Sequence, residues 1–144
     1  MTHQTRVKIL KLASILLLIA FAPVMAFSVL PPADWVAQHF LSLARLDVSQ
    51  PYLTDPGGRL VSAILGGVLL GLGISIWQVV SLVYARDPVT GRAILLPTIL
   101  GWYVLDSAGS ILADAWFNAV LNTVFAACFL VPLLWRQPAG QPDA

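Results

Sequence analysis

Glutamate is absent from this chain of 144 residues, and charged residues of every kind make up only 10% of it. A soluble globule of this length has about 25% charged residues, because its surface faces water. Hydrophobic residues account for 58% of the chain, which leaves too few charges to cover an aqueous surface. The composition therefore predicts an integral membrane protein whose apolar surface contacts the lipid bilayer.

Cysteine and histidine are nearly as scarce. The single cysteine, Cys128, lies in an apolar run, which excludes an internal disulfide and a CxxC redox centre. His3 and His39 both lie outside the apolar runs, and no GxSxG motif surrounds a serine nucleophile. These absences argue against a metal site, a haem and a nucleophilic triad. We predict no cofactor and no catalysis, with a membrane enzyme as the least favoured alternative.

Basic residues are few and scattered. Eight lysines and arginines give a net charge of +1, without the clustered basic patch that attracts a phosphate backbone. Nucleic acid is therefore not an expected partner.

Four apolar stretches are long enough to cross a bilayer, which takes about 20 residues in a helix. They cover residues 12–30, 60–84, 93–113 and 116–135. These crossings use most of the chain, so we predict one all-α membrane domain over residues 1–136, built as a four-transmembrane-helix bundle. The polar, proline-containing residues 137–144 are predicted to be a disordered tail.

The first stretch has a second interpretation. Val24, Met25 and Ala26 form an acceptable signal-peptide cleavage site, and Pro23 precedes it. We favour an uncleaved span, because the apolar run is longer than the core of a usual signal peptide. Cleavage would leave three spans in the same orientation.

A short amphipathic helix is predicted over residues 33–46, in the loop after the first span. Its apolar residues recur at helical spacing: Trp35, Val36, His39, Phe40 and Leu43. We expect an interfacial helix on the outer membrane surface, with its aromatic rings at headgroup depth. The alternative is a lid or a partner-docking element.

The orientation of the bundle follows from its basic residues, which are retained in the cytoplasm when they flank a span. An N-inside arrangement places six of them on the inner side: Arg6, Lys8, Lys11, Arg86, Arg92 and Arg136. Only Arg45 and Arg59 fall on the outer side. We therefore predict a multi-pass protein of the bacterial inner membrane with both termini in the cytoplasm.

The second span carries a ridge of small residues at intervals of four: Ala63, Gly67, Gly71 and Ser75. Gly66 and Gly73 flank this ridge. Small residues let helix backbones approach closely in lipid, so we predict a helix-packing face. A ligand groove, or a contact with a second copy or another membrane protein, is the alternative.

A carboxylate lies deep in the third span. Asp106 is about eight residues, or about 12 Å of helix rise, from the abrupt turn expected at Asp114. Such a group is costly in lipid and usually faces the interior of a bundle. In an antiparallel hairpin, Asp106 would lie level with Asn122 and Thr123, and Ser110 level with Asn118.

These residues predict a polar ladder between the last two spans, formed by Trp102, Asp106, Ser110, Asn118 and Asn122. In the favoured interpretation the ladder ties the hairpin together, in a small protein of structural or accessory, protein-interaction type. In the alternative, Asp106 binds a proton or a cationic ligand in a proton-coupled transporter or small-ligand binding protein.

Three segments carry a resemblance: Gly57-Gly58-Arg59-Leu60, Trp102 to Ser110, and Asn118 to Asn122. Together they look like a pattern in small uncharacterised four-span bacterial membrane proteins, loosely similar to the DoxX-like group. The resemblance covers roughly the last 80 residues. It implies a four-helix bundle in the bacterial inner membrane, and it implies no activity.

Overall fold

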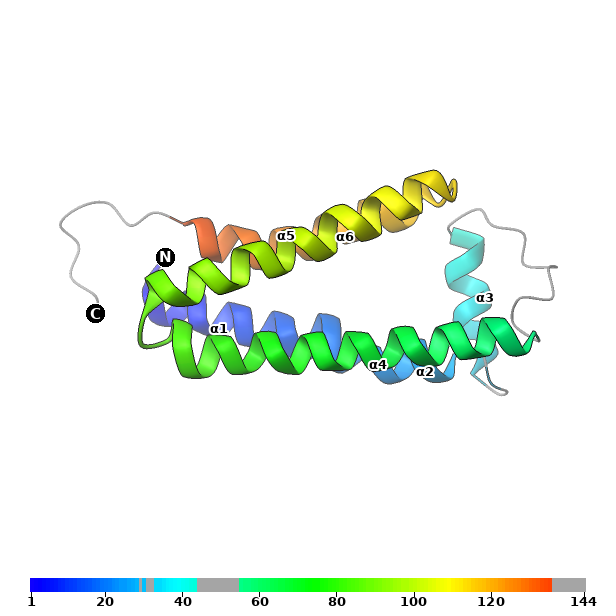
Figure 1. Ribbon diagram of the computed structural model, residues 1–144, viewed down its shortest axis with the longest axis horizontal. Coiled ribbons are helices and arrows are strands. Elements are labelled where there is room, and N and C mark those ends of the chain that lie inside the picture. Colours follow the sequence, from blue (N-terminus) through cyan, green and yellow to red (C-terminus); the bar gives the residue numbers. More distant parts are fainter. Residues whose placement is uncertain (29, 31–32, 44–54, 136–144) are drawn as a thin grey trace.

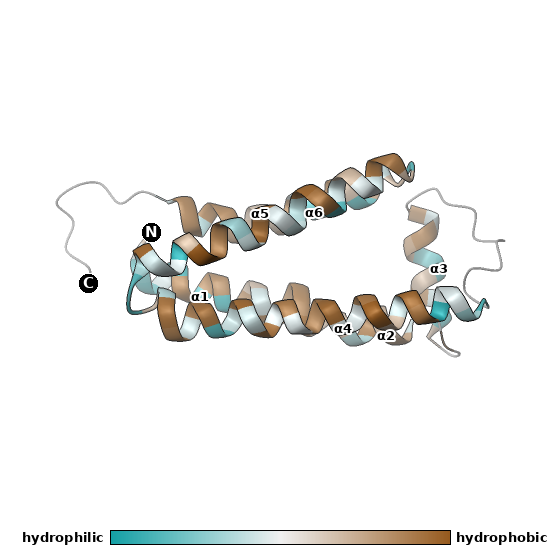
Figure 2. Ribbon diagram, in the orientation of Figure 1, coloured by the Kyte–Doolittle hydropathy of each residue, from teal (hydrophilic) through white to brown (hydrophobic). Residues whose placement is uncertain are grey.

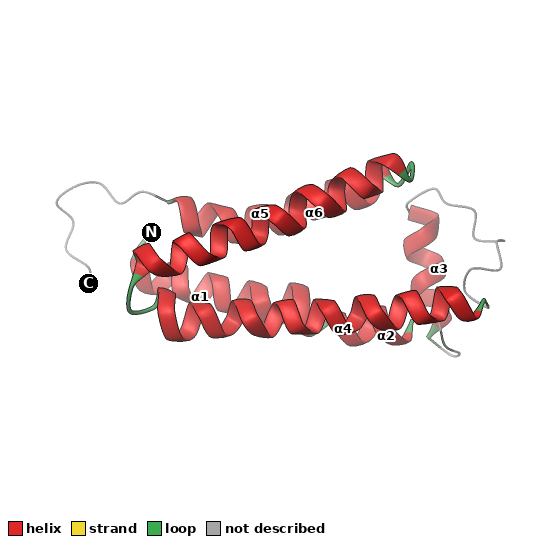
Figure 3. Cartoon of the chain, in the orientation of Figure 1, coloured by secondary structure: helices red, strands yellow, loops and turns green. Residues whose placement is uncertain are grey.

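The computed structural model describes residues 1–28, 30, 33–43 and 55–135, and these residues form helices joined by short turns (Figure 3). Four helical segments are long and apolar enough to cross a membrane: His3–Phe27, Pro56–Tyr84, Pro88–Leu112 and Trp116–Leu134. The prediction of an all-helical chain with four such segments is confirmed. The predicted tail at 137–144 and residues 44–46 of the predicted amphipathic helix lie outside the described residues.

The first segment is longer at its start than the predicted 12–30. It consists of α1 (His3–Ala13), the π-helical η1 (Ser14–Ile19) and α2 (Phe21–Phe27). Thr2 caps α1 by accepting a hydrogen bond from the backbone N–H of Thr5 at 3.2 Å, so the helix begins before the apolar run does. The break after η1 leaves Pro23 in the first turn of α2, where its missing N–H needs no partner.

The next two spans also begin earlier than the predicted residues 60 and 93. The second consists of α4 (Pro56–Val79) and the π-helical η3 (Val80–Tyr84), and the third is α5 (Pro88–Leu112). Each follows an aspartate cap with proline as its first residue. Asp55 accepts from the N–H of Gly58 at 3.1 Å, and Asp87 accepts from the N–H groups of Val89 and Thr90 at 3.0 and 3.1 Å.

These caps correct one prediction. Residues 88–92, which the predicted span 93–113 left in the preceding connection, belong to the first turns of α5. Polar residues at a helix start resemble a loop in a hydropathy profile, although they satisfy the free N–H groups of the helix. The pKa of Asp87 lies below its usual range, chiefly because of a hydrogen bond to the side chain of Thr90 and then because of one to its backbone.

The abrupt turn expected near Asp114 is confirmed. Asp114 has a φ of 58°, in the left-handed region that aspartate tolerates better than most residues. The last span, α6 (Trp116–Leu134), starts two residues later and runs antiparallel to α5 (Figure 1).

The long helices are arranged as two pairs (Figure 1). In one pair α4 packs along η1 and α2, and in the other α5 packs along α6. The pairs meet at the end where the chain starts, because α1 contacts α6 there and η3 contacts both α1 and α5. Towards the other end they diverge, and α3 (Asp34–Leu43) lies across that end, with the ring of Phe40 edge-on to Phe117 at 6.1 Å.

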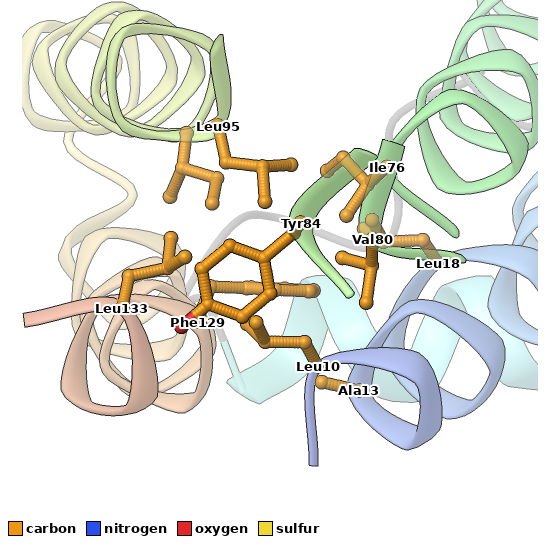
Figure 4. Packing of buried hydrophobic residues seen from close by; sticks show 10 residues of the cluster. Leu10, Ala13, Leu18, Ile76, Val80, Tyr84, Leu95, Phe129 and Leu133 are labelled. Carbon is orange, nitrogen blue, oxygen red and sulfur yellow. The ribbon is translucent and has the colours of Figure 1, made fainter. Parts of the chain in front are cut away.

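The hydrophobic core lies at the joined end (Figure 4). Tyr84 is fully buried at its centre and is surrounded by residues from every span: Leu10, Ala13, Leu18, Ile76, Val80, Leu95, Ile99, Phe129 and Leu133. Outside this core, large apolar side chains stay exposed on all four spans, among them Leu12, Leu60, Leu105 and Val120. Figure 2 shows that hydrophobic residues recur along all the long helices. This surface is compatible with contact to lipid.

The helix α4 packs closely against the first segment at Gly66 and Gly73. A Cβ atom at Gly66 would lie 2.5 Å from the Cβ of Ala26, and one at Gly73 would lie 2.8 Å from the Cβ of Leu18. The ridge at Ala63, Gly67, Gly71 and Ser75 is exposed instead, and a Cβ at either glycine would meet no described atom within 4 Å. The close approach therefore lies to one side of the predicted ridge, since spacing alone does not say which face of α4 meets α2.

Candidate functional site

A cluster of polar side chains joins α5 to α6, two of the helices that are long and apolar enough to cross a membrane. The amide nitrogen of Asn118 donates to Asp106 Oδ1 at 3.1 Å and to Ser110 Oγ at 2.7 Å. The Ser110 hydroxyl donates to the backbone oxygen of Asp106 at 2.8 Å and lies 3.3 Å from its Oδ1. Three of the five residues predicted for the ladder are thus in direct contact.

The helical spacing explains this arrangement. Asp106 and Ser110 are one turn apart on α5 and share a face, so one amide from the antiparallel α6 reaches both of them. The predicted pairing of Ser110 with Asn118 is present. The hydroxyl groups of Tyr103 and Thr123 lie 3.0 Å apart. With the Ser110–Asn118 contact, this pairing fixes the register of the two helices and sets Asp106 between the levels of Asn118 and Asn122. Its carboxylate meets Asn118 and not Asn122.

Two further polar side chains on the same two helices have no hydrogen-bond partner within the described residues. Asn122 is only 5% exposed, and its Nδ2 forms no hydrogen bond with the described part of the chain. Ser107, the sequence neighbour of Asp106, is 9% exposed, and its Oγ is likewise unpaired among these residues. A buried polar group without a partner costs about 1–3 kcal/mol, so both positions favour an added hydrogen-bonding group.

Sequence reasoning did not identify Ser107 as a site residue. The only indication in the sequence is that this small hydroxyl-bearing residue is adjacent to Asp106. Trp102, the remaining predicted residue, is half-buried one turn from Asp106 and makes no hydrogen bond within the described ranges. It is not part of the hydrogen-bonded cluster.

The chemistry of the cluster is limited to one carboxylate, two amides and two hydroxyls. Such a set can hold a proton, a cation or a hydrogen-bonding ligand. Residues 1–28, 30, 33–43 and 55–135 contain no group of three or more histidine, cysteine or acidic side chains that could hold a metal ion. No protein-family model, curated protein or solved structure matches the chain.

The hydrogen bonds of Asn118 generate a stability prediction. Asn118→Leu should lower the free energy of unfolding by about 1–3 kcal/mol, because it leaves the Asp106 carboxylate without its donor from α6. The double variant Asp106→Leu/Asn118→Leu should recover part of this loss, since both partners are then apolar. Chemical unfolding in detergent, followed by circular dichroism, measures the difference. An Asn118→Leu protein as stable as the parent contradicts the predicted role.

Proposed function

We propose that this chain is a multi-pass protein of the bacterial inner membrane with a structural or accessory role, acting through contacts with other membrane proteins and without catalysis. The observation that carries this proposal is the hydrogen bonding of Asp106. Its Oδ1 accepts from Asn118 and lies close to Ser110, both in its own hairpin. A carboxylate that ties α5 to α6 needs no substrate to account for its depth in the span.

The distribution of charge supports the proposed orientation. Five basic residues lie on the elements that meet at the joined end: Arg6, Lys8 and Lys11 on α1, Arg86 just after η3, and Arg92 in the first turns of α5. At the opposite end, Asp34 begins α3, Asp55 caps α4 with Arg59 in its first turn, and Asp114 lies in the turn between α5 and α6. Positive residues remain on the cytoplasmic side of a membrane, so the joined end, with the start of α1 and the end of α6, is the cytoplasmic one. Arg45 and Arg136 lie outside the described residues.

The outer end then carries α3 as the interfacial helix. Two features support this position: α3 runs across the long helices in Figure 1, and Trp35 on it is 65% exposed. An exposed tryptophan on a helix parallel to the membrane plane is typical of the headgroup region. The contact of Phe40 with Phe117 also suits the alternative of a lid or docking element.

The proposed contact surface is the ridge of Ala63, Gly67, Gly71 and Ser75 on α4. It is exposed, and its two glycines have open space where a Cβ would be. Small residues of this kind allow close packing of a helix from a second copy or from another membrane protein. The resemblance to DoxX-like four-helix proteins is compatible with such a role and stays a prediction.

Gly67→Leu/Gly71→Leu tests this surface. The double variant should lose any larger complex that the parent forms in native membranes, because bulky side chains prevent close helix approach, while its own thermal stability should change little. Gly101→Leu is the matched control, since Gly101 is also exposed with nothing within 4 Å of its Cβ position. Native gel electrophoresis of gently solubilised membranes gives the complex mass. Unchanged complexes in the double variant, or equal losses in both proteins, would reject the ridge as the contact.

A second function, proton-coupled transport or small-ligand binding at Asp106, is favoured by the unpaired Ser107 and Asn122 groups beside it. Asp106→Asn separates the two functions, because asparagine keeps an acceptor oxygen for Asn118 but cannot take up a proton. If Asp106 couples transport, proton flux in proteoliposomes should fall to background in this variant while the fold is retained. Flux that persists at the parental rate in the variant excludes this function, and a parent protein whose flux does not exceed that of protein-free liposomes supports the structural role.

A further inference from the structure

A second polar cluster lies at the joined end of the bundle, far from Asp106. Arg6 on α1 is only 5% exposed, although arginine is rarely buried without a partner of opposite charge. One terminal nitrogen, Nη1, donates to the backbone oxygen of Trp135 at 3.3 Å, while the buried Nε has no hydrogen-bond partner among the described residues. Within the described residues no carboxylate forms an ion pair with this guanidinium.

Tyr84 provides a neutral hydrogen-bonding group to the same region. Its side chain is fully buried, and its hydroxyl has no partner in the described ranges. Figure 4 shows the ring extending from η3 towards Phe129 and Leu133 of α6, next to Leu10. Leu10 is one turn from Arg6 on the same face of α1, so the hydroxyl and the guanidinium both lie where α1 meets α6.

Arg92 approaches this region from α5. It follows Gly91, whose Cβ position is 2.5 Å from the Cα of Tyr84. The Tyr103–Thr123 and Ser110–Asn118 hydrogen bonds fix the antiparallel register of α5 and α6, and extending that register sets Arg92 level with Trp135. Its Nε is also buried, with no hydrogen-bond partner in the part of the chain that the structure describes.

We propose that Arg6, Arg92 and the Tyr84 hydroxyl form a binding site for a phosphate group. A buried guanidinium is strongly disfavoured without an anion, and its planar set of N–H groups matches phosphate oxygens. The source of the phosphate is the headgroup of an anionic phospholipid or free inorganic phosphate. Basic sites between spanning helices on the cytoplasmic side are typical of headgroup binding.

The local acidic group does not neutralise this charge. Asp87 is exposed, and its side chain caps α5 through the N–H groups of Val89 and Thr90. The other basic residues of this end, such as Lys8 and Arg86, are exposed to solvent and need no counter-ion in the fold. They provide matched controls for a loss of positive charge.

The site is tested with the full chain in a neutral detergent, by titrating phosphatidylglycerol and counting bound lipids by native mass spectrometry. Arg92→Gln and Arg6→Gln should each weaken binding about tenfold, whereas Lys8→Gln and Arg86→Gln should change it less than about twofold. Tyr84→Phe should weaken binding by a smaller factor and keeps the core packed. Circular dichroism confirms helical content, and if Arg6→Gln does not fold, Arg92→Gln and Tyr84→Phe decide.

A second arm titrates sodium phosphate against sodium chloride at equal ionic strength. Competition by phosphate at millimolar concentration, lost in Arg92→Gln, supports the site with free phosphate as its source. Lipid binding that resists phosphate supports the headgroup. Equal weakening by all four glutamine variants shows general attraction of anions to a basic surface and overturns the proposal. Parental binding that is no tighter than that of Arg92→Gln in both arms also overturns the proposal.

Discussion

The fold depends on one close contact between backbones, at the point where η3 turns into α5. A Cβ at Gly91 would lie 2.5 Å from the Cα of Tyr84 and 2.8 Å from its backbone nitrogen. Only glycine permits this approach, since backbone atoms cannot move aside as a flexible side chain can. The contact holds the two helix pairs together at one end and places the Tyr84 ring in the centre of the core. Arg6 on α1 reaches the same end of the bundle, where its Nη1 donates to the backbone oxygen of Trp135.

Away from this contact, each helix pair is stabilised by its own chemistry. The pair of α2 and α4 relies on close backbone approach at Gly66 and Gly73, whereas α5 and α6 are tied by the bonds of Asn118 to Asp106 and Ser110. Both devices suit a lipid environment, where apolar burial drives helix association little and small residues and interhelical hydrogen bonds contribute more. The polar cluster therefore stabilises the hairpin in the region where it diverges from α2 and α4.

Hydropathy and charge in the sequence predict the four spans and the hairpin turn, and spacing predicts the contact of Ser110 with Asn118. Each of these depends on residues close together along the chain. The starts of α4 and α5 were not predicted, because the capping residues Asp55 and Asp87 look like loop residues. The packing face of α4 and the burial of Arg6 depend on how helices that are distant in the sequence meet. The two π-helical segments affect this packing. No local pattern in the sequence encodes it.

The most direct test of the central contact is the stability of Gly91→Ala compared with Gly101→Ala, measured by chemical unfolding in detergent. Both changes place one methyl group in α5, but Gly101 has nothing within 4 Å of its Cβ position. Alanine normally stabilises a helix relative to glycine by about 0.5–1 kcal/mol, so Gly101→Ala should be neutral or stabilising. Gly91→Ala should lower the free energy of unfolding by about 2 kcal/mol or more, because the backbones must separate. Equal stability of the two variants would contradict the close contact between η3 and α5.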